Sequence, residues 1–294
     1  MRSFGCQSMV APIRCMLLKH PRQAFRSQTI IDKQWQGLGY SSPPDFDHAV
    51  AEYEQFLGLL EQFDFEIHFA PLAEATSLDS LYIHDPLTIT QNGVILNRMG
   101  KEARASEPEA AGKYLETLDL PILGKITGNG NVEGGDLLWV DERTLAVGQG
   151  FRTNAEGLRQ LLELLGDCVD EVIPVQLPYW TGPQDCLHLL SFISIVDKDL
   201  AVVYSRLMPV PFREWVLERG FQLVEVPDEE YDSLGTNVLA VAPRKCVMLS
   251  GNPQTQKQLE EAGAQVWTYE GRHISLKGTG GPTCLTRPIL RDFE

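Results

Sequence analysis

The feature that most constrains the fold of this chain is a unit of secondary structure that recurs along it. Each copy has two apolar runs around a turn, then an amphipathic helix, then one further apolar strand. The sharpest turn is the Asn-Gly pair in LTITQNGVILNR (87–98), which favours a tight hairpin. Hairpins that alternate with crossover helices predict an α/β fold with mixed sheets rather than a doubly wound parallel sheet. Recurrence about every 50 to 60 residues predicts a ring or propeller of similar units.

The elements of these units can be assigned along nearly the whole chain. No low-complexity linker interrupts them, so we expect a single domain over 1–294, with 1–9 as a candidate for disorder. Thr153 or Asn154 is the expected N-cap of the helix at 153–166. The expected elements are hairpins at 87–98, 136–148, 190–205 and 237–251, helices at 43–63, 107–118, 153–166, 211–220 and 253–263, and strands at 10–18, 65–71, 171–177, 221–227 and 264–270.

Composition narrows the class of partner. Hydrophobic residues make up 43% of the 294 residues and charged residues 22%, which is typical of a globular protein with a substantial core. The formal net charge is −15, and phosphate binding needs a surplus of Lys and Arg, so we expect no nucleic-acid partner. An acidic surface suits a small cationic substrate. The sequence leaves a homo-oligomer open.

Cysteine usage and hydropathy bear on the compartment. The six cysteines are scattered without a CxxC pair, which favours reduced thiols in the cytoplasm, and they lack the spacing of a zinc site with the histidines. Pro12 and Arg14 interrupt the apolar run near the N-terminus, so we expect no signal peptide. No other stretch approaches the ~18 apolar residues that a membrane span needs. We therefore expect a cytoplasmic protein without a metal or a membrane partner.

Four polar clusters stand at the ends of predicted elements. In DSLYIHD, Asp79 and Asp85 are six residues apart, so in a strand both carboxylates would lie on one face. Each cluster taken singly also fits a structural role, such as a solvated edge, a Gly-Gly turn, a core histidine or a small buried thiol. The clusters are DSLYIHD (79–85), NVEGGDLLWV with Glu133 and Asp136, DCLHLL with His188, and GTGGPTCLTRPI with Cys284.

Two arginines precede predicted helices. Arg104 lies in NRMGKEARASEPE and Arg152 in GQGFRTNAEG. A helix N-terminus favours anions, so an arginine gains nothing there from the helix dipole. It could instead bind a substrate carboxylate together with the free N–H groups of the helix. A solvated arginine is the alternative at each position.

Read in order, YIHD, EGGD, CLHL and GGPTCL resemble the guanidino-group modifying (pentein) superfamily, over roughly residues 79 to 290. That superfamily includes arginine deiminases, dimethylarginine dimethylaminohydrolases and amidinotransferases. The resemblance implies a five-bladed α/β propeller of ββαβ units around a central site. It is closest to the dimethylarginine dimethylaminohydrolase and arginine deiminase branch.

The resemblance also implies a role for each candidate residue. Cys284 is similar to the family's nucleophile, His188 to its general acid/base, and Glu133 to the acid that supports both histidine and guanidinium. Gly281 implies clearance for the substrate beside the thiol. The residues that resemble substrate-binding positions are Asp85 and Asp79 toward the guanidinium, Arg104 and Arg152 toward the substrate carboxylate, and Asp136, for which a structural role in the turn is equally open.

Two positions depart from the family pattern. Arginine deiminases and amidinotransferases usually carry an aspartate two residues after the histidine, and this chain has Leu190. This difference favours the dimethylargininase-like branch. That branch usually has glutamate where this chain has His84, which leaves the alkylation preference of the substrate open.

The chemistry explains why these residue types occur together. Carboxylates can hold a planar guanidinium against a thiolate, which adds to its central carbon, and an imidazole can protonate the departing amine and later activate water. No cofactor is needed. We therefore expect a thiol hydrolase that converts arginine or N-methylated arginine to citrulline plus ammonia or an alkylamine. The alternatives are an amidinotransferase, a hydrolase for another amidine such as agmatine, and a non-catalytic arginine-binding propeller.

Overall fold

Fifteen short strands and the helices between them make up residues 4–292, the part of the chain that the computed structural model describes. The strands form five three-stranded sheets. In each sheet two strands pair antiparallel, and a third joins the second in parallel. The predicted α/β architecture with mixed sheets is therefore confirmed. The sheets are β15 (Thr286–Arg291), β1 (Ile13–Leu18) and β2 (Glu66–Phe69); β3 (Leu87–Thr90), β4 (Gly93–Leu96) and β5 (Ile122–Lys125); β6 (Leu137–Trp139), β7 (Thr144–Gln149) and β8 (Glu171–Gln176); β9 (Ile193–Asp197), β10 (Leu200–Val203) and β11 (Gln222–Glu225); and β12 (Leu239–Ala242), β13 (Lys245–Leu249) and β14 (Gln265–Tyr269).

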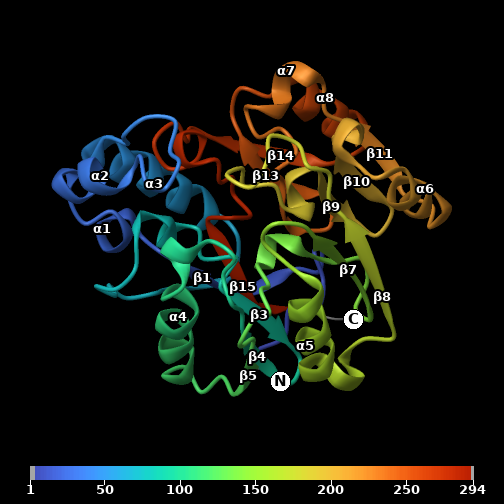
Figure 1. Cartoon of the computed structure of the whole chain (residues 1–294). Helices are drawn as coiled ribbons and strands as arrows, with labels where there is room; N and C mark the ends of the chain where they lie inside the picture. Colours follow the sequence, from blue (N-terminus) through green and yellow to red (C-terminus); the bar gives the residue numbers. More distant parts are fainter. Residues whose placement is uncertain (1–3, 293–294) are drawn as a thin grey trace.

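The two ends of the chain close the ring. Four sheets are built from consecutive segments, but the remaining sheet takes β15 from the C-terminal end and pairs it antiparallel with β1. Figure 1 shows blue β1 and red β15 together near the middle of the molecule. Five units, each an antiparallel strand pair followed by a helix and a parallel strand, confirm the predicted five-bladed α/β propeller.

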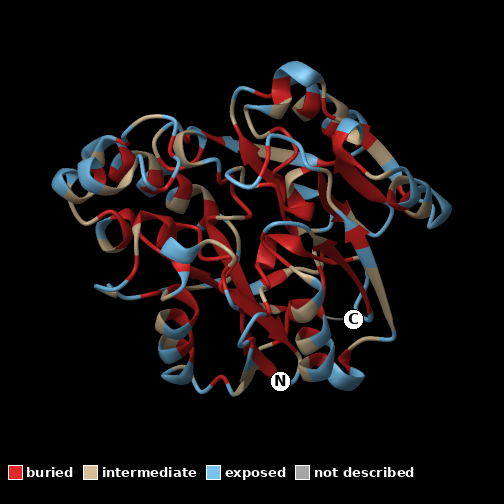
Figure 2. Cartoon of the chain, in the orientation of Figure 1, coloured by how far each residue is buried: buried red, intermediate tan, exposed pale blue. Residues whose placement is uncertain are grey.

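The helices lie at the periphery and the strands toward the centre (Figure 1), and exposed residues concentrate on the outer faces of the helices (Figure 2). None of the helices within residues 4–292 is long and apolar enough to cross a membrane. The helices are α1 (Pro21–Ala24), α2 (Gln28–Gln34), α3 (Phe46–Leu60), α4 (Glu107–Glu116), α5 (Ala155–Leu165), α6 (Val210–Glu218), α7 (Asp228–Tyr231) and α8 (Pro253–Glu261).

Helix α5 shows how the sequence sets one of these elements. The side chain of Asn154, rather than that of Thr153, accepts a hydrogen bond from a backbone N–H of the first turn and caps the helix. At the other end Gly166 has a φ of +49°, which ends the helix where a residue with a side chain would be strained. Three leucines at helical spacing turn one face toward the sheet, namely Leu158, Leu161 and Leu165.

Residues 79–85 do not form the predicted strand. Leu78–Leu81 is a short 3₁₀ helix, and the chain then turns before β3 begins. The inference that Asp79 and Asp85 share one strand face is therefore wrong. Both carboxylates are nevertheless buried, because Lys101 and Arg104, which follow β4, reach back to pair with them.

Residues 4–9 also differ from the expectation of disorder over 1–9. The N–H of Gly5 donates to the carbonyl of Ile289 on β15, and Cys6 and Gln7 are buried. The side-chain amide of Gln7 donates to the carbonyls of Glu142 and Cys168. These hydrogen bonds hold the segment against the ring. Residues 1–3, which belong to the same expectation, lie outside the described residues.

Candidate active site

One end of the ring gathers a polar residue from each of the five units. In every sheet the first strand of the hairpin follows a short segment that carries one of these residues, so ring closure brings together positions that are far apart in the sequence. The predicted residues Asp85, Glu133, His188 and Cys284 are all among them. The five are Asp85 before β3, Glu133 before β6, His188 before β9, Asn237 before β12 and Cys284 before β15.

His188 and Glu133 form a buried pair. The imidazole Nε2 lies 2.7 Å from the Oε2 atom of Glu133, which is fully buried. Burial alone would lower the pKa of His188, but its interactions with neighbouring groups, first Cys186 and then Asp136 and Asp85, raise that pKa well above its usual value. Burial would raise the pKa of Glu133, but the hydrogen bond from His188 holds that pKa below its usual value. The pair is therefore an imidazolium and a carboxylate.

The other oxygen of Glu133 is held by the backbone. Its Oε1 atom accepts hydrogen bonds from the N–H groups of Gly100 and Lys101, at 2.9 and 3.2 Å. The N–H of Glu133 donates to the hydroxyl of Thr153. These contacts fix the carboxylate, and through it they fix the orientation of the His188 ring.

Asp85 is the acceptor for a buried guanidinium of the protein itself. Nη1 of Arg104 lies 2.6 Å from its Oδ2 atom, and the N–H of Gly135 donates to Oδ1 at 2.9 Å. Burial would raise the pKa of Asp85, but the charges of Arg104 and His188 hold that pKa well below its usual value. Asp85 is therefore ionised and available to a cationic ligand through any lone pair that these donors leave free.

Arg104 pairs mainly with groups of the protein itself. Its Nε and Nη2 atoms donate to the carboxylate of Glu107, Nη1 donates to Asp85, and Nη2 also donates to the carbonyl of Tyr82. Its side chain is only 3% exposed. These contacts hold Asp85 in place and use four of the five N–H groups of Arg104, so that one Nη1–H has no acceptor among the described residues.

Arg152 differs from Arg104 in the length of its contacts. It is buried, and it donates to Glu133 Oε2 at 3.4 Å and to the carbonyl of Asp185 at 3.3 Å. Hydrogen bonds of this length are weak. Arg152 is therefore the better candidate of the two arginines for binding a substrate anion.

The Cys284 thiol lies beside Asn237. Nδ2 of Asn237 is 3.3 Å from Sγ, and its Oδ1 atom accepts a hydrogen bond from the N–H of Thr283. Burial and the charge of Asp85 raise the pKa of Cys284 to about 11, while Asn237 and His188 act to lower it. The resting thiol is therefore protonated, and a cation bound beside it would favour the thiolate.

The EGGD motif packs its backbone directly beneath these groups. A Cβ on Gly134 would lie 2.5 Å from the carbonyl oxygen of His84, and a Cβ on Gly135 would lie 2.5 Å from Nδ1 of His188. Asp136 accepts a hydrogen bond from the N–H of Leu189, next to the catalytic histidine candidate. Burial raises the pKa of Asp136 to about 6. The structural role left open for Asp136 is thus visible in its contact with the His188 segment.

Asp79 and Gly281 lie beside protein groups rather than in open space. The carboxylate of Asp79 pairs with Lys101 Nζ at 2.6 Å, and Lys101 also donates to the carbonyl of Leu38. A Cβ on Gly281 would lie 2.5 Å from the side chain of Asn237. The glycine therefore lets Asn237 reach the thiol, a different clearance from the one predicted for the substrate.

Two groups of side chains in the described residues could hold a metal ion. Ligand atoms of Asp85, Glu133 and His188 lie within 4.8 Å of one another, and so do those of a second group, Cys15, Glu66 and His68. In the first group the oxygens already pair with Arg104 and His188. That arrangement of planar donors and carboxylates suits a guanidinium at least as well as a metal ion.

Three neighbours of the site were not predicted from the sequence. Asn237 contacts the thiol, Glu107 supports Arg104, and the Cys186 sulfur lies 3.8 Å from Nδ1 of His188. The repeat could have indicated Asn237, because it precedes β12 by the same two residues that separate Asp85 from β3. Glu107 and Cys186 carry no comparable signal.

Comparison with known proteins agrees with this geometry. Residues 77–218 and 209–291 match the arginine deiminase family, and together they span well over half of the chain. The chain belongs to the arginine deiminase family. Its membership confirms the predicted assignment to the guanidino-group modifying (pentein) superfamily. The chain is also similar to the N(G),N(G)-dimethylarginine dimethylaminohydrolase of Pseudomonas aeruginosa, with 27% identity over 247 residues, which are 83% of this chain and 89% of that protein.

Two solved structures share the fold. A mutant dimethylarginine dimethylaminohydrolase from Pseudomonas aeruginosa complexed with citrulline has a TM-score of 0.76 at 23% identity, covering 94% of this chain and 98% of that one. An amidinotransferase from Microseira wollei, from the saxitoxin biosynthetic pathway, has a TM-score of 0.81 at 12% identity, covering 99% of this chain and 98% of that one. At these identities the likeness concerns the propeller fold alone.

Proposed function

We propose that this protein is a thiol hydrolase that acts on the guanidinium carbon of arginine or an N-methylated arginine and releases citrulline with ammonia, methylamine or dimethylamine. The observation that carries the proposal is the convergence of Cys284, the His188–Glu133 pair and Asp85 from four separate units of the ring. The similarity to a dimethylarginine dimethylaminohydrolase supports the same reaction class.

The substrate cation would be held by carboxylates. Asp85 and Glu133 have acceptor oxygens close to one another, and both are ionised. A guanidinium bound to them would lie against Cys284 and lower its thiol pKa from about 11, because a nearby positive charge favours the thiolate. Substrate binding itself would then generate the nucleophile.

The reaction would proceed in two steps. The Cys284 thiolate adds to the guanidinium carbon, and the His188 imidazolium protonates the amine as its C–N bond breaks, which leaves a covalent S-alkylthiouronium. Water then attacks the same carbon and gives its proton to the neutral His188. Cleavage of the C–S bond releases the ureido product and regenerates the thiol. A single imidazole serves both steps, and Glu133 stabilises its charged form.

A second candidate is a hydrolase for a guanidine without an α-carboxylate, such as agmatine. The observation that favours it is the engagement of Arg104 with Asp85, Glu107 and the carbonyl of Tyr82, which leaves one of its five N–H groups without an acceptor among the described residues. Arg152, with its long contacts, is then the better placed of the two arginines to bind a carboxylate. An amidinotransferase would instead release the alkylamine of its donor, keep the amidino group on Cys284 and pass that group to a second amine.

The test is a substrate panel. Purified protein is incubated with arginine, monomethylarginine, dimethylarginine and agmatine, with and without an acceptor amine, and the ureido product and the released amine are measured. The proposal predicts citrulline from arginine or a methylarginine, and a rise in KM for that substrate in Arg152→Gln. Preference for agmatine would select the second candidate. No ureido product from any of the four would contradict both.

A further inference from the structure

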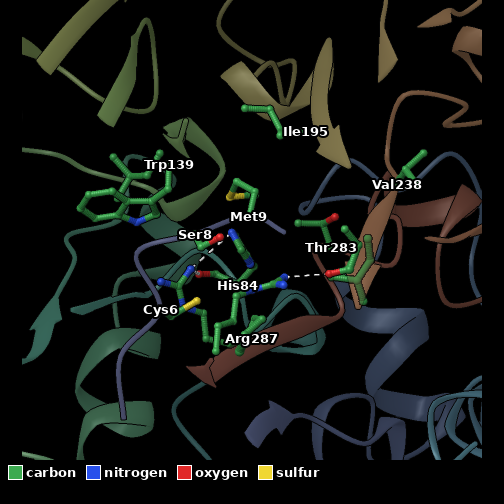
Figure 3. A pocket seen from close by; sticks show the side chains of 14 residues that line it. Cys6, Ser8, Met9, His84, Trp139, Ile195, Val238, Thr283 and Arg287 are labelled. Carbon is green, nitrogen blue, oxygen red and sulfur yellow. Dashed lines mark hydrogen bonds between the residues drawn. The ribbon is translucent and has the colours of Figure 1, made fainter. Parts of the chain in front are cut away.

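A small cavity lies between the inner strands of the ring, next to the segment that carries Cys284. Residues of β6, β9, β12 and β15 line it together with the N-terminal segment, and Thr283 reaches it from the residue before Cys284 (Figure 3). It has room for about one or two water molecules. Its polar lining comes from Cys6, Ser8, His84, Thr283, Arg287 and Arg291, and it includes no carboxylate.

Two buried arginines of β15 face this cavity without a charged partner. Arg287 is 5% exposed and Arg291 is 2% exposed, and neither forms an ion pair with a carboxylate among residues 4–292. The terminal nitrogens of Arg291 donate to the carbonyls of Ala11 and Ala240. The Nε atom of each arginine is buried and has no hydrogen-bond partner.

His84 does not supply the missing negative charge. Its Nδ1 atom lies 3.0 Å from the carbonyl oxygen of Thr286, so Nδ1 carries the hydrogen, since a carbonyl can only accept. Nε2 is then a lone pair, and it lies 3.3 Å from Nη1 of Arg287. Burial and the charge of Arg287 lower the pKa of His84 to about 3. The ring is therefore neutral and accepts one hydrogen bond from the arginine.

The positive charges of Arg287 and Arg291 are not paired with a carboxylate from their remaining neighbours either. Asp85 is the carboxylate whose charge reaches Arg287, but its oxygens already pair with Arg104 and the N–H of Gly135. The Cys6 thiol lies beside both guanidinium groups. Arginine stays protonated in proteins, and an unpaired buried charge is strongly destabilising. Water could accept the N–H bonds, but it brings no charge.

We propose that this cavity binds a small inorganic anion of about the size of chloride, held by the free Nε–H groups of Arg287 and Arg291. The hydroxyls of Ser8 and Thr283 line the same space and can donate to it. The single negative charge of the anion offsets part of the repulsion between the two guanidinium groups along β15. It therefore stabilises the closure of the ring, because β15 is the strand that pairs the C-terminal end with β1.

The direct test is chloride binding to the whole chain. The protein is exchanged into sodium gluconate, chloride is added at constant ionic strength, and the ³⁵Cl NMR line width and the melting temperature are followed. The expected result is excess line broadening that bromide competes away, with a saturable rise of a few degrees in melting temperature. No chloride-dependent broadening in the wild-type protein would overturn the proposal.

Variants assign the effect to the cavity. Arg291→Met should abolish the excess broadening, and Arg287→Gln provides a second variant if the first does not fold. Arg206→Gln is the matched control, since that arginine is exposed and pairs with Asp228 at the surface. Broadening that persists in folded Arg287→Gln or Arg291→Met would show an adventitious site elsewhere and overturn the assignment.

The Cys6 thiolate is the alternative counter-ion within the protein. With a bound anion as the partner of the two arginines, Cys6→Ala should keep the chloride dependence of the wild-type protein. Chloride dependence that appears only in Cys6→Ala would mean that the thiolate normally fills the role, and it would contradict the proposal. Crystals soaked in bromide provide an independent readout, with an anomalous peak expected beside Arg287 and Arg291.

Discussion

Nε2 of His188 lies 2.7 Å from Oε2 of Glu133, although the two residues belong to different units of the ring and are 55 positions apart. Glu133 has no exposed surface, and its second oxygen is held by two backbone N–H groups. The imidazole is therefore oriented by a carboxylate that cannot move without breaking three contacts. This pair connects the fold to the proposed chemistry.

Glu133→Gln should reduce kcat by about a hundred- to ten-thousandfold, because the imidazolium loses the charge that stabilises it. Removing that charge also lowers the pKa of His188, which is raised in the native site. The activity that needs protonated His188 should then be lost at a lower pH than in the wild-type enzyme. The pH dependence of kcat measures this shift, and Glu225→Gln is a surface control. A fall in kcat with an unchanged pH profile would contradict the role.

Asn237→Ala should weaken catalysis by raising the pKa of Cys284, since the Asn237 side chain acts to lower that pKa. A reduction of about ten- to a hundredfold is expected, the size of one lost hydrogen bond to a charged group. The pH dependence of iodoacetamide labelling of Cys284 measures the thiol directly. Labelling that becomes faster at neutral pH in Asn237→Ala would be inconsistent with this reading.

Arg104→Met should destabilise the fold by about 3–5 kcal/mol, because it leaves Asp85 and Glu107 as buried carboxylates without their partner. The pKa of Glu107 is already raised to about 7 by burial despite the nearby arginine. Adding Glu107→Gln to Arg104→Met should therefore recover part of the loss. Urea unfolding of the four proteins of this double-mutant cycle measures the coupling. Additive losses would show that the two residues do not act together.

Asp136→Asn should change the pH dependence of stability in a defined direction. Burial raises the pKa of Asp136 from 3.8 to about 6, so between these values the folded state binds a proton that the unfolded state has lost. In the wild-type protein the contribution of Asp136 to the free energy of unfolding is fully present below about pH 4, and it decreases as pH rises to 6. The free energy of unfolding of Asp136→Asn, relative to that of the wild-type protein, should therefore rise by on the order of 3 kcal/mol between pH 4 and pH 8. A stability difference that is constant over this range would contradict the shift.

Much of the fold could be predicted from short-range patterns. The Asn92-Gly93 turn, the cap at Asn154 and the alternation of hairpin and helix are local signals, and apart from a strand at 79–85 each predicted element is present. Residues 79–85 form a 3₁₀ helix and a turn instead, and the partners of their carboxylates, Lys101 and Arg104, come from beyond β4, which a local pattern does not indicate. The pairing of β15 with β1 depends on the closure of the ring, which no local sequence pattern predicts.

The candidate site could be predicted in part for a similar reason. Cys284, His188, Glu133 and Asp85 were identified from motifs, and the structure brings them together. The pairing of Arg104 with Glu107 was missed because a helical arginine and a glutamate three residues later usually form an exposed ion pair. Here both side chains are buried, so the two residues pair inside the protein instead of at its surface. The contact of Asn237 with the thiol depends on the packing of two inner strands against each other.

The most direct test of the central claim is mass spectrometry of the enzyme quenched in acid during turnover of arginine or a methylarginine. The account predicts a covalent adduct on the peptide that contains Cys284, with the mass of the substrate less that of the departing amine. The adduct should be absent in Cys284→Ser and retained in Cys246→Ser, a buried cysteine outside the site. Turnover without an adduct, or an adduct on Cys186 instead, would contradict the assignment of Cys284 as the nucleophile.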